Sequence, residues 1–495
     1  MDLFACETGA LLACAAYLLE DDLNAVSPFI LTCIEDNLKR RILLPYLTAH
    51  FWWMGHDDEP MCNWTVWCTQ NVLLTTFLMP WSEEMSSKLA APARAFTGDA
   101  PLFLPENTSD TVVALQAILH KAAESCDYFL KDYGNDGCCE EGAQYYRHAG
   151  LCLYGAMTVL NTVTAGHFDT LFRWDKVKNI ASYILNVHVN DKYYFNFADC
   201  SPIAGRAGVR EYLFGKATGQ EDLCLFAAKD FQAGQGQLFT DEVNGGNLFY
   251  RMQTVFHYEE LMQQNTSGTL SHRDVYYPSV GLFLVHSDTL DLAVKAGDNA
   301  DSHNHNDTGS ITLYKNGLPI LADIGVETYT RKTFSPRRYE IWTMQSGYHN
   351  LPTICGTDQK DGVEYRAEKV VTELTGAEPS ISMELAAAYP DAGAVVPGLT
   401  YSRRVTLKKS SNTVVLEDHT NAQDVILNFI TYEKPVILSD GKLSIGEASA
   451  SFEGADLLAI ETLPITDARL KTAWDHDLYR IRLKGSDAGF RLTIQ

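Results

Sequence analysis

Apolar residues recur at helical spacing along the first half of the chain. They return every three or four positions, which gathers them on one face of a helix. Short polar or proline-containing joints separate the segments. Successive helices without strands between them predict paired antiparallel helices, arranged either as a bundle or as an (α/α) toroid. The predicted helices cover residues 2–20, 24–46, 63–80, 110–132, 141–163, 166–189 and 247–263.

The pattern changes near residue 264 to short runs typical of β-strands. These runs are rich in β-branched and aromatic residues and are bounded by Gly, Asn, Asp and Ser. Asn316-Gly317 and Asp440-Gly441 are dipeptides that two-residue hairpin turns prefer. Many short strands without intervening helices predict an antiparallel β-sandwich. The predicted strands cover residues 280–287, 290–297, 310–324, 413–420, 425–432, 442–449, 457–463, 479–485 and 490–495.

The length and the charge narrow the fold class and the partners. At 495 residues the chain is too long for one ordinary domain. We expect a multidomain α+β protein, with an (α/α) toroid of helix pairs over residues 1–263 and an antiparallel β-sandwich over residues 264–495. The formal net charge is −24. Nucleic acids and anionic membranes attract basic surfaces, so we expect neither as a partner.

The N-terminus and the cysteines indicate a cytoplasmic protein. Residues 1–23 lack the basic region of a signal peptide, and Glu7 interrupts their apolar run, so they read as a packed helix. Eleven of the twelve cysteines precede residue 225, mostly at apolar helical positions, where reduced cysteine packs as a small hydrophobe. A disulfide framework is not expected in so long a chain.

The densest polar cluster, Ser302–Asp307, is a candidate metal site. A two-residue turn at Asn316-Gly317 would place Ser310 opposite Asp323, so the returning strand would bring Asp323 close to this loop. His349 could supply a third ligand. His305, Asp323 and His349 would form a set compatible with zinc and an open fourth position. The alternative is a polar turn whose side chains bind backbone groups.

A second polar cluster lies between Asp136 and His148. Glu141 suits the first turn of a helix, and Tyr145 would follow one turn later, near an end that could border a cleft. The alternative for Tyr145 is ordinary aromatic packing. Asn63 opens an earlier helix and could be only its N-cap. His148 is expected to be a structural or surface residue.

A basic island stands out in this acidic sequence. Residues 331–339 carry Arg331, Lys332, Arg337 and Arg338 between Asp323 and His349. The two later arginines could neutralise a carboxylate of a substrate. The alternative is a solvated loop.

Together these motifs resemble the heparinase II/III-like polysaccharide lyases over nearly the whole chain. The resemblance implies an (α/α) toroid followed by antiparallel β-sheet domains, with a substrate cleft between them. The motifs that carry it are Ser302-His-Asn-His-Asn-Asp-Thr-Gly-Ser310, Asn316-Gly317, Asp323-Ile-Gly325, Ser346-Gly-Tyr-His349-Asn350, Asp136-Gly137, Glu141-Gly142, Tyr145 and Asn63-Trp64.

The resemblance also implies β-elimination on a uronic acid unit. This reaction removes the proton at C5, next to the carboxylate, and expels the oxygen at C4. The C5 proton becomes acidic once the carboxylate is neutralised. By resemblance, Asn63 would grip the carboxylate, while Tyr145 and His303 would share the base and acid roles. His305, Asp323 and His349 match the family's zinc ligands, and the zinc would be mainly structural.

The substrate would be an acidic oligosaccharide or polysaccharide. Some family members carry His where this chain has Trp64, and an indole cannot act as a base, so the base role shifts toward Tyr145 or His303. Tyr146 adjoins Tyr145, and the catalytic tyrosine stays open between them. The residues expected to bind substrate are Trp64, Glu141, Tyr146, Arg337 and Arg338.

Two other functions remain open from the sequence. One is a glycoside hydrolase on a toroid, with paired carboxylates drawn from Asp136, Glu140 and Glu141. The other is a glycan-binding protein that keeps the cleft without turnover. Whether the chain forms a homodimer also stays open.

Overall fold

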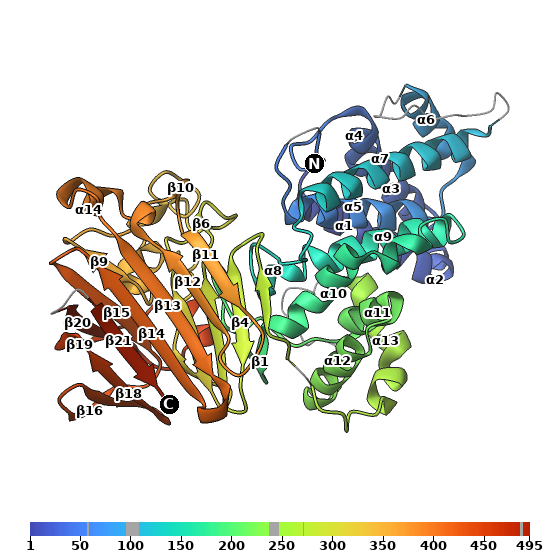
Figure 1. The fold of residues 1–495 in the computed structure, drawn as a ribbon. Helices are drawn as coiled ribbons and strands as arrows, with labels where there is room; N and C mark the ends of the chain where they lie inside the picture. Colours follow the sequence, from blue (N-terminus) through green and yellow to red (C-terminus); the bar gives the residue numbers. More distant parts are fainter. Residues whose placement is uncertain (57–58, 96–107, 237–246, 271, 486–488) are drawn as a thin grey trace. The chain divides into compact units, whose positions relative to one another are not determined.

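The computed structural model describes residues 1–56, 59–95, 108–236, 247–270, 272–485 and 489–495. Contacts within the chain divide it into two compact units, coloured mainly blue to green and yellow to red in Figure 1. The helical unit comprises Met1–Cys139, Tyr145–Ser182 and Gly205–Leu270, and the strand unit comprises Glu140–Gln144, Tyr183–Ala204 and Ser271–Gln495. The predicted division at residue 263 placed the two short inserted segments with the helices, whereas they pack with the strands.

The helices of the first unit pack in pairs, as the apolar spacing predicts. α1 packs against α5, α5 against α9, α6 against α7, and α11 against α12. Polar side chains begin several of them: Asp2 accepts a bond from the Ala5 amide at 2.9 Å, and Ser109 accepts one from the Val112 amide at 3.4 Å. Their bounds are α1 Leu3–Leu18, α2 Glu20–Val26, α3 Phe29–Leu38, α4 Leu44–Thr48, α5 Asn63–Leu78, α6 Glu83–Arg94, α7 Asp110–Asp132, α8 Ala143–Tyr146, α9 Gly150–Val163, α10 Asp175–Val187, α11 Val209–Thr218, α12 Glu221–Ala233 and α13 Leu248–Gln263.

Among the described helices of the first unit, three escape the sequence pattern: α6, α11 and α12. In α11 the buried side includes Arg210 and Glu211, which are 5% and 3% exposed. The carboxylate of Glu211 pairs with the buried Arg147 guanidinium at 3.3 Å. Charged residues that are buried in pairs interrupt the apolar periodicity on which the prediction depends.

α5 is buried on nearly every side. Two of its buried threonines are satisfied along the helix, since Thr75 and Thr76 donate to the carbonyls of Asn71 and Val72 at 2.8 Å each. Buried hydroxyl groups with such partners carry little cost. α5 therefore forms the centre of the helical packing, and its first residue is Asn63.

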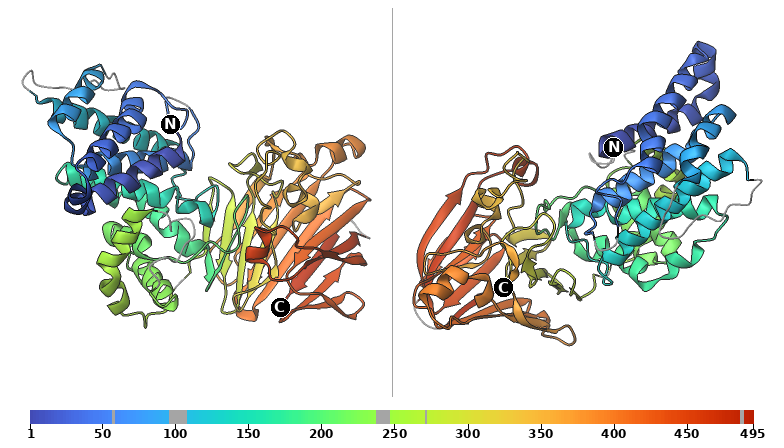
Figure 2. Two further views of the ribbon diagram at one scale, coloured as in Figure 1. Left: turned by 180° about the vertical axis from the view of Figure 1, so that it is seen from behind. Right: turned by 90° about the horizontal axis from the view of Figure 1, so that it is seen from above.

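The strand unit is an antiparallel β-sandwich, which confirms the predicted fold class. One sheet has the order β11-β12-β13-β14-β21-β18-β17-β16, and the other has the order β19-β20-β15-β8-β7-β5-β4-β3, with β9 on β15. The orange strands of the first sheet lie side by side in Figures 1 and 2. Bounds are β3 Val275–Tyr277, β4 Leu282–His286, β5 Leu290–Lys295, β7 Ile311–Lys315, β8 Leu318–Leu321, β9 Pro352–Ile354, β11 Glu368–Glu373, β12 Ser380–Glu384, β13 Tyr401–Lys408, β14 Thr413–Thr420, β15 Val425–Thr431, β16 Val436–Ser439, β17 Lys442–Ile445, β18 Ala448–Glu453, β19 Ala455–Leu463, β20 Leu478–Gly485 and β21 Gly489–Ile494.

The strand unit also contains two small two-stranded sheets. Strands β1 (His188–Asn190) and β2 (Tyr193–Tyr194) pair with each other, and β6 (Asp298–Asn299) pairs with β10 (Gly362–Arg366). The core between the two large sheets is apolar and includes Leu292 and Leu313 of one sheet and Leu416 of the other, each 0% exposed. Burial of this core supplies the main driving force for the sandwich.

The predicted hairpin at Asn316-Gly317 is present. Both turn residues have positive φ, 50° and 76°, as a type I′ turn requires. Lys315 faces Leu318 as predicted, but a bulge then shifts the register, so that Leu313 faces Leu321. The chain after β8 nevertheless carries Asp323 back toward the start of β7, because Asn350 donates to the carbonyls of Ile311 and Ala322 at 2.6 and 3.1 Å.

Each of the twelve cysteines is described, and none forms a disulfide. Within the described part of the chain, no single helix has the length and apolar composition needed to cross a membrane. α1 and α2 meet that test only as a pair, which is bent by 86° at their junction.

Candidate functional site

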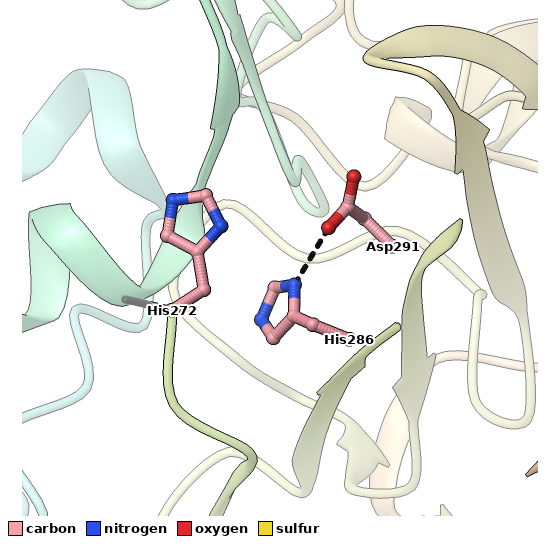
Figure 3. A group of neighbouring side chains, drawn as sticks. All are labelled: His272, His286 and Asp291. Atoms are coloured by element: carbon pink, nitrogen blue, oxygen red, sulfur yellow. Dashed lines mark hydrogen bonds and ion pairs between the residues drawn. The ribbon is translucent and has the colours of Figure 1, made fainter. Parts of the chain in front are cut away.

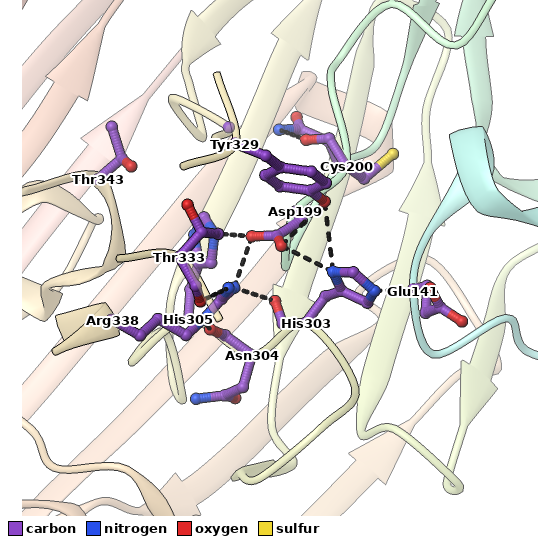
Figure 4. Close-up of polar contacts among 12 residues, drawn as sticks. Glu141, Asp199, Cys200, His303, Asn304, His305, Tyr329, Thr333, Arg338 and Thr343 are labelled. Carbon is purple, nitrogen blue, oxygen red and sulfur yellow. Dashed lines mark hydrogen bonds and ion pairs between the residues drawn. The ribbon is translucent and has the colours of Figure 1, made fainter. Parts of the chain in front are cut away.

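A buried aspartate, Asp199, is the centre of the densest polar network in the strand unit (Figure 4). Its two carboxylate oxygens accept bonds from four side chains. These are His303 Nδ1 at 2.8 Å, His305 Nε2 at 3.1 Å, the Tyr329 hydroxyl at 3.0 Å and Arg338 Nη2 at 2.6 Å. Burial alone would raise the pKa of Asp199, but these bonds and the arginine charge hold that pKa far below its ordinary value.

His303 lies between two carboxylates. Its Nε2 is 3.2 Å from Glu141 Oε2, and its Nδ1 faces Asp199. Burial alone would lower the pKa of His303, but Asp199 and Glu141 together raise it above its ordinary value. Its backbone has φ 59°, in the left-handed region that non-glycine residues rarely adopt. Such strain persists where the surroundings fix the residue, and it clusters at functional sites.

The two predicted arginines have partners of their own. Arg338 donates to Asp199 and to the carbonyls of His303 and Asn304, at 2.8 and 2.9 Å. It therefore holds the histidine loop, and its charge already faces a carboxylate. Arg337 is exposed and pairs with Glu340 at 2.7 Å. The prediction that either guanidinium is available to a substrate carboxylate is not supported, because both are already in ion pairs.

His303 borders a pocket of about 580 Å³ within the strand unit. This volume falls in the range of pockets that bind small ligands. His303 keeps 20% of its side chain exposed here, whereas Asp199 and His305 are fully buried. The pocket walls also include Phe334, Tyr339 and the stem of Arg338. Of this network, His303 is therefore the imidazole that a ligand in the pocket could reach.

The structure brings together the three predicted metal ligands. One ligand atom each from His305, Asp323 and His349 lies within 4.8 Å of the others, and all three residues are buried. His349 Nδ1 is 3.0 Å from Asp323 Oδ2. The three predicted ligands therefore lie together, although the bulge shifts the predicted register of the hairpin, and a simple polar turn does not account for three converging ligand atoms.

The outer contacts of these three residues orient their inner atoms. His305 bonds Asp199 through Nε2, and its Nδ1 is buried without a hydrogen-bond partner among the described residues. His349 bonds the Thr343 carbonyl through Nε2 at 3.2 Å, which leaves Nδ1 toward Asp323. Asp323 Oδ1 accepts bonds from Asn196 and the Gly325 amide, at 3.0 and 2.9 Å. Such outer bonds fix the tautomer and orientation of metal ligands. This donor set fits zinc.

In the helical unit, a row of three rings leads from α5, which begins at Asn63, to Tyr145. Asn63 is the first residue of α5 and is 6% exposed, and Cys62 occupies the cap position, so the N-cap alternative for Asn63 is wrong. Trp67 lies one turn further on the same face of α5. Its ring stacks on His148 with centroids 3.7 Å apart, and His148 meets Tyr145 edge-on at 6.5 Å.

Of the two adjacent tyrosines, Tyr145 is the more accessible. Tyr146 is 0% exposed and donates from its hydroxyl to the Ala181 carbonyl at 3.1 Å. Its ring packs so closely that a Cβ added at Gly150 would lie 2.6 Å from it. The predicted contact of Tyr146 with substrate is therefore not supported, because this ring belongs to the core, whereas Tyr145 is half-buried.

Trp64 and Glu141 have different surroundings. Trp64 is half-buried and lies against Trp52, with ring centroids 5.2 Å apart, and Trp52 is 63% exposed. This pair presents aromatic surface of the kind that stacks on sugar rings. Glu141 is 3% exposed and faces His303, so its partner here is the imidazole.

The buried His148 should make the stability of the folded protein depend on pH. Burial and the nearby Arg210 and Arg147 charges hold the pKa of His148 well below its ordinary value of 6.5. Below pH 6.5 the unfolded chain therefore binds a proton that the folded chain does not, so stability falls as the pH falls, by up to about 1.4 kcal/mol per pH unit. His148→Phe should reduce this loss between pH 6.5 and 5, measured by urea unfolding. Equal slopes in both proteins would contradict this role.

Sequence reasoning missed Asp199, Tyr329 and Arg469. Asp199 follows Ala198, which has φ 52°, in an irregular segment far from the histidine loop in sequence. Arg469 donates to the Asp199 carbonyl oxygen at 3.1 Å and lies over the Tyr329 ring, 4.5 Å from its centroid. Single residues in loops leave no periodic signal, so only the folded chain reveals their convergence.

Residues 269–426 match a family model described as Heparinase II/III-like, C-terminal. The predicted resemblance is therefore confirmed over the segment that holds His303, His305, Asp323 and His349. No curated protein matches the sequence.

Solved structures extend the similarity in fold over most of the chain. The heparan sulfate lyase HepC from Pedobacter heparinus is 11% identical with a TM-score of 0.55, over 87% of this chain and 67% of its own. A chondroitin AC lyase mutant from Streptomyces coelicolor A3 is 12% identical with a TM-score of 0.57, over 100% of this chain and 74% of its own. At these identities the comparison shows the fold, an (α/α) toroid followed by a β-sandwich.

The chain spans about two thirds of the length of the heparinase structures that it matches, 66% for one heparinase III and 67% for HepC.

Proposed function

We propose that this protein is a polysaccharide lyase that cleaves uronic-acid-containing glycans by β-elimination. The proposal starts from the match of residues 269–426 to the heparinase II/III-like family model. The observation that carries the proposal is His303, held by Asp199 and Glu141 in a strained backbone conformation at the edge of a pocket. The HepC structure is that of a heparan sulfate lyase, and a second chondroitin AC lyase structure is a complex with chondroitin sulphate.

His303 is proposed as the acid that protonates the departing O4. Both of its ring nitrogens face carboxylates, an arrangement that favours the imidazolium form. A positively charged ring at the pocket would also stabilise the negative charge that develops on the substrate carboxylate when C5 loses its proton. This places on His303 part of the charge neutralisation that the sequence had assigned to Arg337 and Arg338.

Tyr145 is proposed as the base that removes the C5 proton. It follows Glu141 by four residues, and the short helix α8 includes Tyr145 itself. Four residues span at most about 14 Å, so chain connectivity keeps Tyr145 close to the carboxylate that pairs with His303. A tyrosine needs a lowered pKa to act as a base near neutral pH. Cationic His303 next to the substrate would favour the phenolate.

Asn63 is proposed to hold the substrate carboxylate by donating from its amide. It opens α5, where the first backbone N–H groups and the helix dipole also favour an anion. Trp64, next to Asn63 and in tilted contact with Trp52, would pack on a sugar ring of the same glycan. An acidic oligosaccharide or polysaccharide is the partner that these groups fit.

His305, Asp323 and His349 are proposed to bind zinc with a structural role. Bound there, the ion would supply charge that fixes the loop from Ser302 to Asp307. His305 also bonds Asp199, so the same loop geometry sets the position of His303.

Replacing a proposed ligand should release the metal. His305→Gln should lower bound zinc by about one equivalent per chain, because a tetrahedral site rarely survives the loss of one of three protein ligands. Elemental analysis after dialysis measures the change, and His167→Gln in the helical unit is the matched control. Unchanged zinc in His305→Gln would contradict the site.

Two of the three carboxylates considered for the hydrolase alternative already have partners within the protein. Glu141 is buried against His303, and Asp136 accepts a bond from the Cys138 amide at 3.1 Å within its turn.

The direct experiment incubates the protein with a panel of uronate oligosaccharides and follows ultraviolet absorbance. A lyase generates a conjugated double bond and absorbance rises. Cleavage without absorbance would favour hydrolysis, and binding without cleavage would favour a glycan-binding protein.

A further inference from the structure

A second cluster of metal-ligating side chains lies in the strand unit and shares no residue with the site described above (Figure 3). His272 precedes β3, His286 is the last residue of β4, and Asp291 is the second residue of β5. β4 and β5 pair so that His286 lies opposite Asp291. One ligand atom from each of the three residues lies within 4.8 Å of the others.

Both imidazoles keep a buried nitrogen without a hydrogen bond. His286 is 8% exposed and bonds Asp291 Oδ1 through Nδ1 at 2.8 Å, while its Nε2 has no hydrogen-bond partner in the described parts of the chain. The same holds for Nε2 of His272, whose ring centroid is 5.0 Å from that of His286. A buried polar atom without a partner is costly and calls for an explanation.

We propose that His272, His286 and Asp291 form a second zinc site. Two imidazoles and a carboxylate are a donor set that zinc prefers over magnesium or calcium. Zinc bonds of about 2.0–2.2 Å require ligand atoms roughly 3.3–3.5 Å apart. Water completes the coordination.

The backbone around the cluster is already fixed. Asp274, two residues after His272, accepts a bond from the His286 amide at 3.0 Å and pairs with Lys409 at 2.5 Å. This contact holds the segment before β3 against the end of β4, so His272 lies close to His286. Zinc there acts as a structural clamp between that segment and the β4–β5 corner. The inference does not rest on the proposed lyase function.

The test measures metal in the full chain with the first site removed. In a His305→Gln background, the protein is stripped of metal and titrated with Co²⁺, whose visible absorption is strong in a tetrahedral site. We expect this variant to show the tetrahedral absorption and to bind about one equivalent. Adding His286→Gln or Asp291→Asn should abolish it, and adding His476→Gln should not.

Circular dichroism checks that each variant folds. His272→Gln tests a further ligand, whose side chain is only half-buried. Zinc content by elemental analysis should follow the cobalt result. A His305→Gln protein without tetrahedral absorption, or one whose metal content survives both His272→Gln and His286→Gln, overturns the proposal.

Discussion

His303→Ala should reduce the turnover of a uronate oligosaccharide by roughly 10²- to 10⁴-fold, the contribution typical of a positioned acid or base. The variant removes the imidazole at the pocket and leaves Asp199 and Glu141 facing each other without the cation between them. The loss should therefore appear mainly in kcat. Initial rates of double-bond formation at saturating substrate measure it.

His476→Ala is the matched control, because this histidine also bonds a carboxylate, Asp475 at 2.7 Å, but is 37% exposed and lies in a different part of the sequence. It should keep the rate of the unmodified protein. Tyr145→Phe should lose turnover to a similar extent. This variant removes only the hydroxyl, which is the group proposed to act as the base. A His303→Ala protein with an unchanged rate would refute the role of this residue.

Arg403→Met should cost about 3–5 kcal/mol of unfolding free energy, as breaking one side of a buried ion pair does. Arg403 and Asp418 are 1% and 2% exposed and bond through two nitrogens, at 2.9 and 2.8 Å. The remaining nitrogen donates to the carbonyls of Gly309 and Asn350, at 2.7 and 2.8 Å. Removing the guanidinium leaves a buried carboxylate and two carbonyls without this partner.

The same contacts tie stability to the site. Gly309 ends the loop that holds His305, and Asn350 follows His349, so Arg403→Met should also weaken metal binding. Arg404→Met on the same strand is the control, because Arg404 is exposed and donates to Ser380 Oγ at 3.2 Å. Urea unfolding gives the comparison. Equal stability of the two variants would contradict the structural role of Arg403.

Arg403 also shows where prediction from the sequence fails. β13 alternates inward and outward residues, but Arg403 occupies an inward position between Tyr401 and Val405. A charged residue at an inward position breaks the alternation by which a strand is recognised in a sequence. In the folded protein, the ion pair with Asp418 makes this buried charge tolerable. Strands with clean alternation and turn signals, such as β7 and β8 around Asn316-Gly317, were predicted correctly.

The residues of the candidate site also divide into those that the sequence predicts and those that only the folded chain reveals. Asp323 could be placed near the loop of His305 from the sequence because a hairpin turn brings the chain back toward that loop, whereas His349 lies outside the hairpin. Asp199 could not, since it lies 104 residues before His303 in an irregular segment and acts by accepting bonds from residues of three other segments. Buried acceptors of this kind are recognised from their partners, which only the folded chain identifies.

The reaction type is tested most directly by weighing the products of a defined uronate oligosaccharide by mass spectrometry. We expect the masses of the two fragments to add up to the mass of the substrate, because elimination takes up no water. Fragments whose masses sum to the substrate plus one water molecule would contradict it.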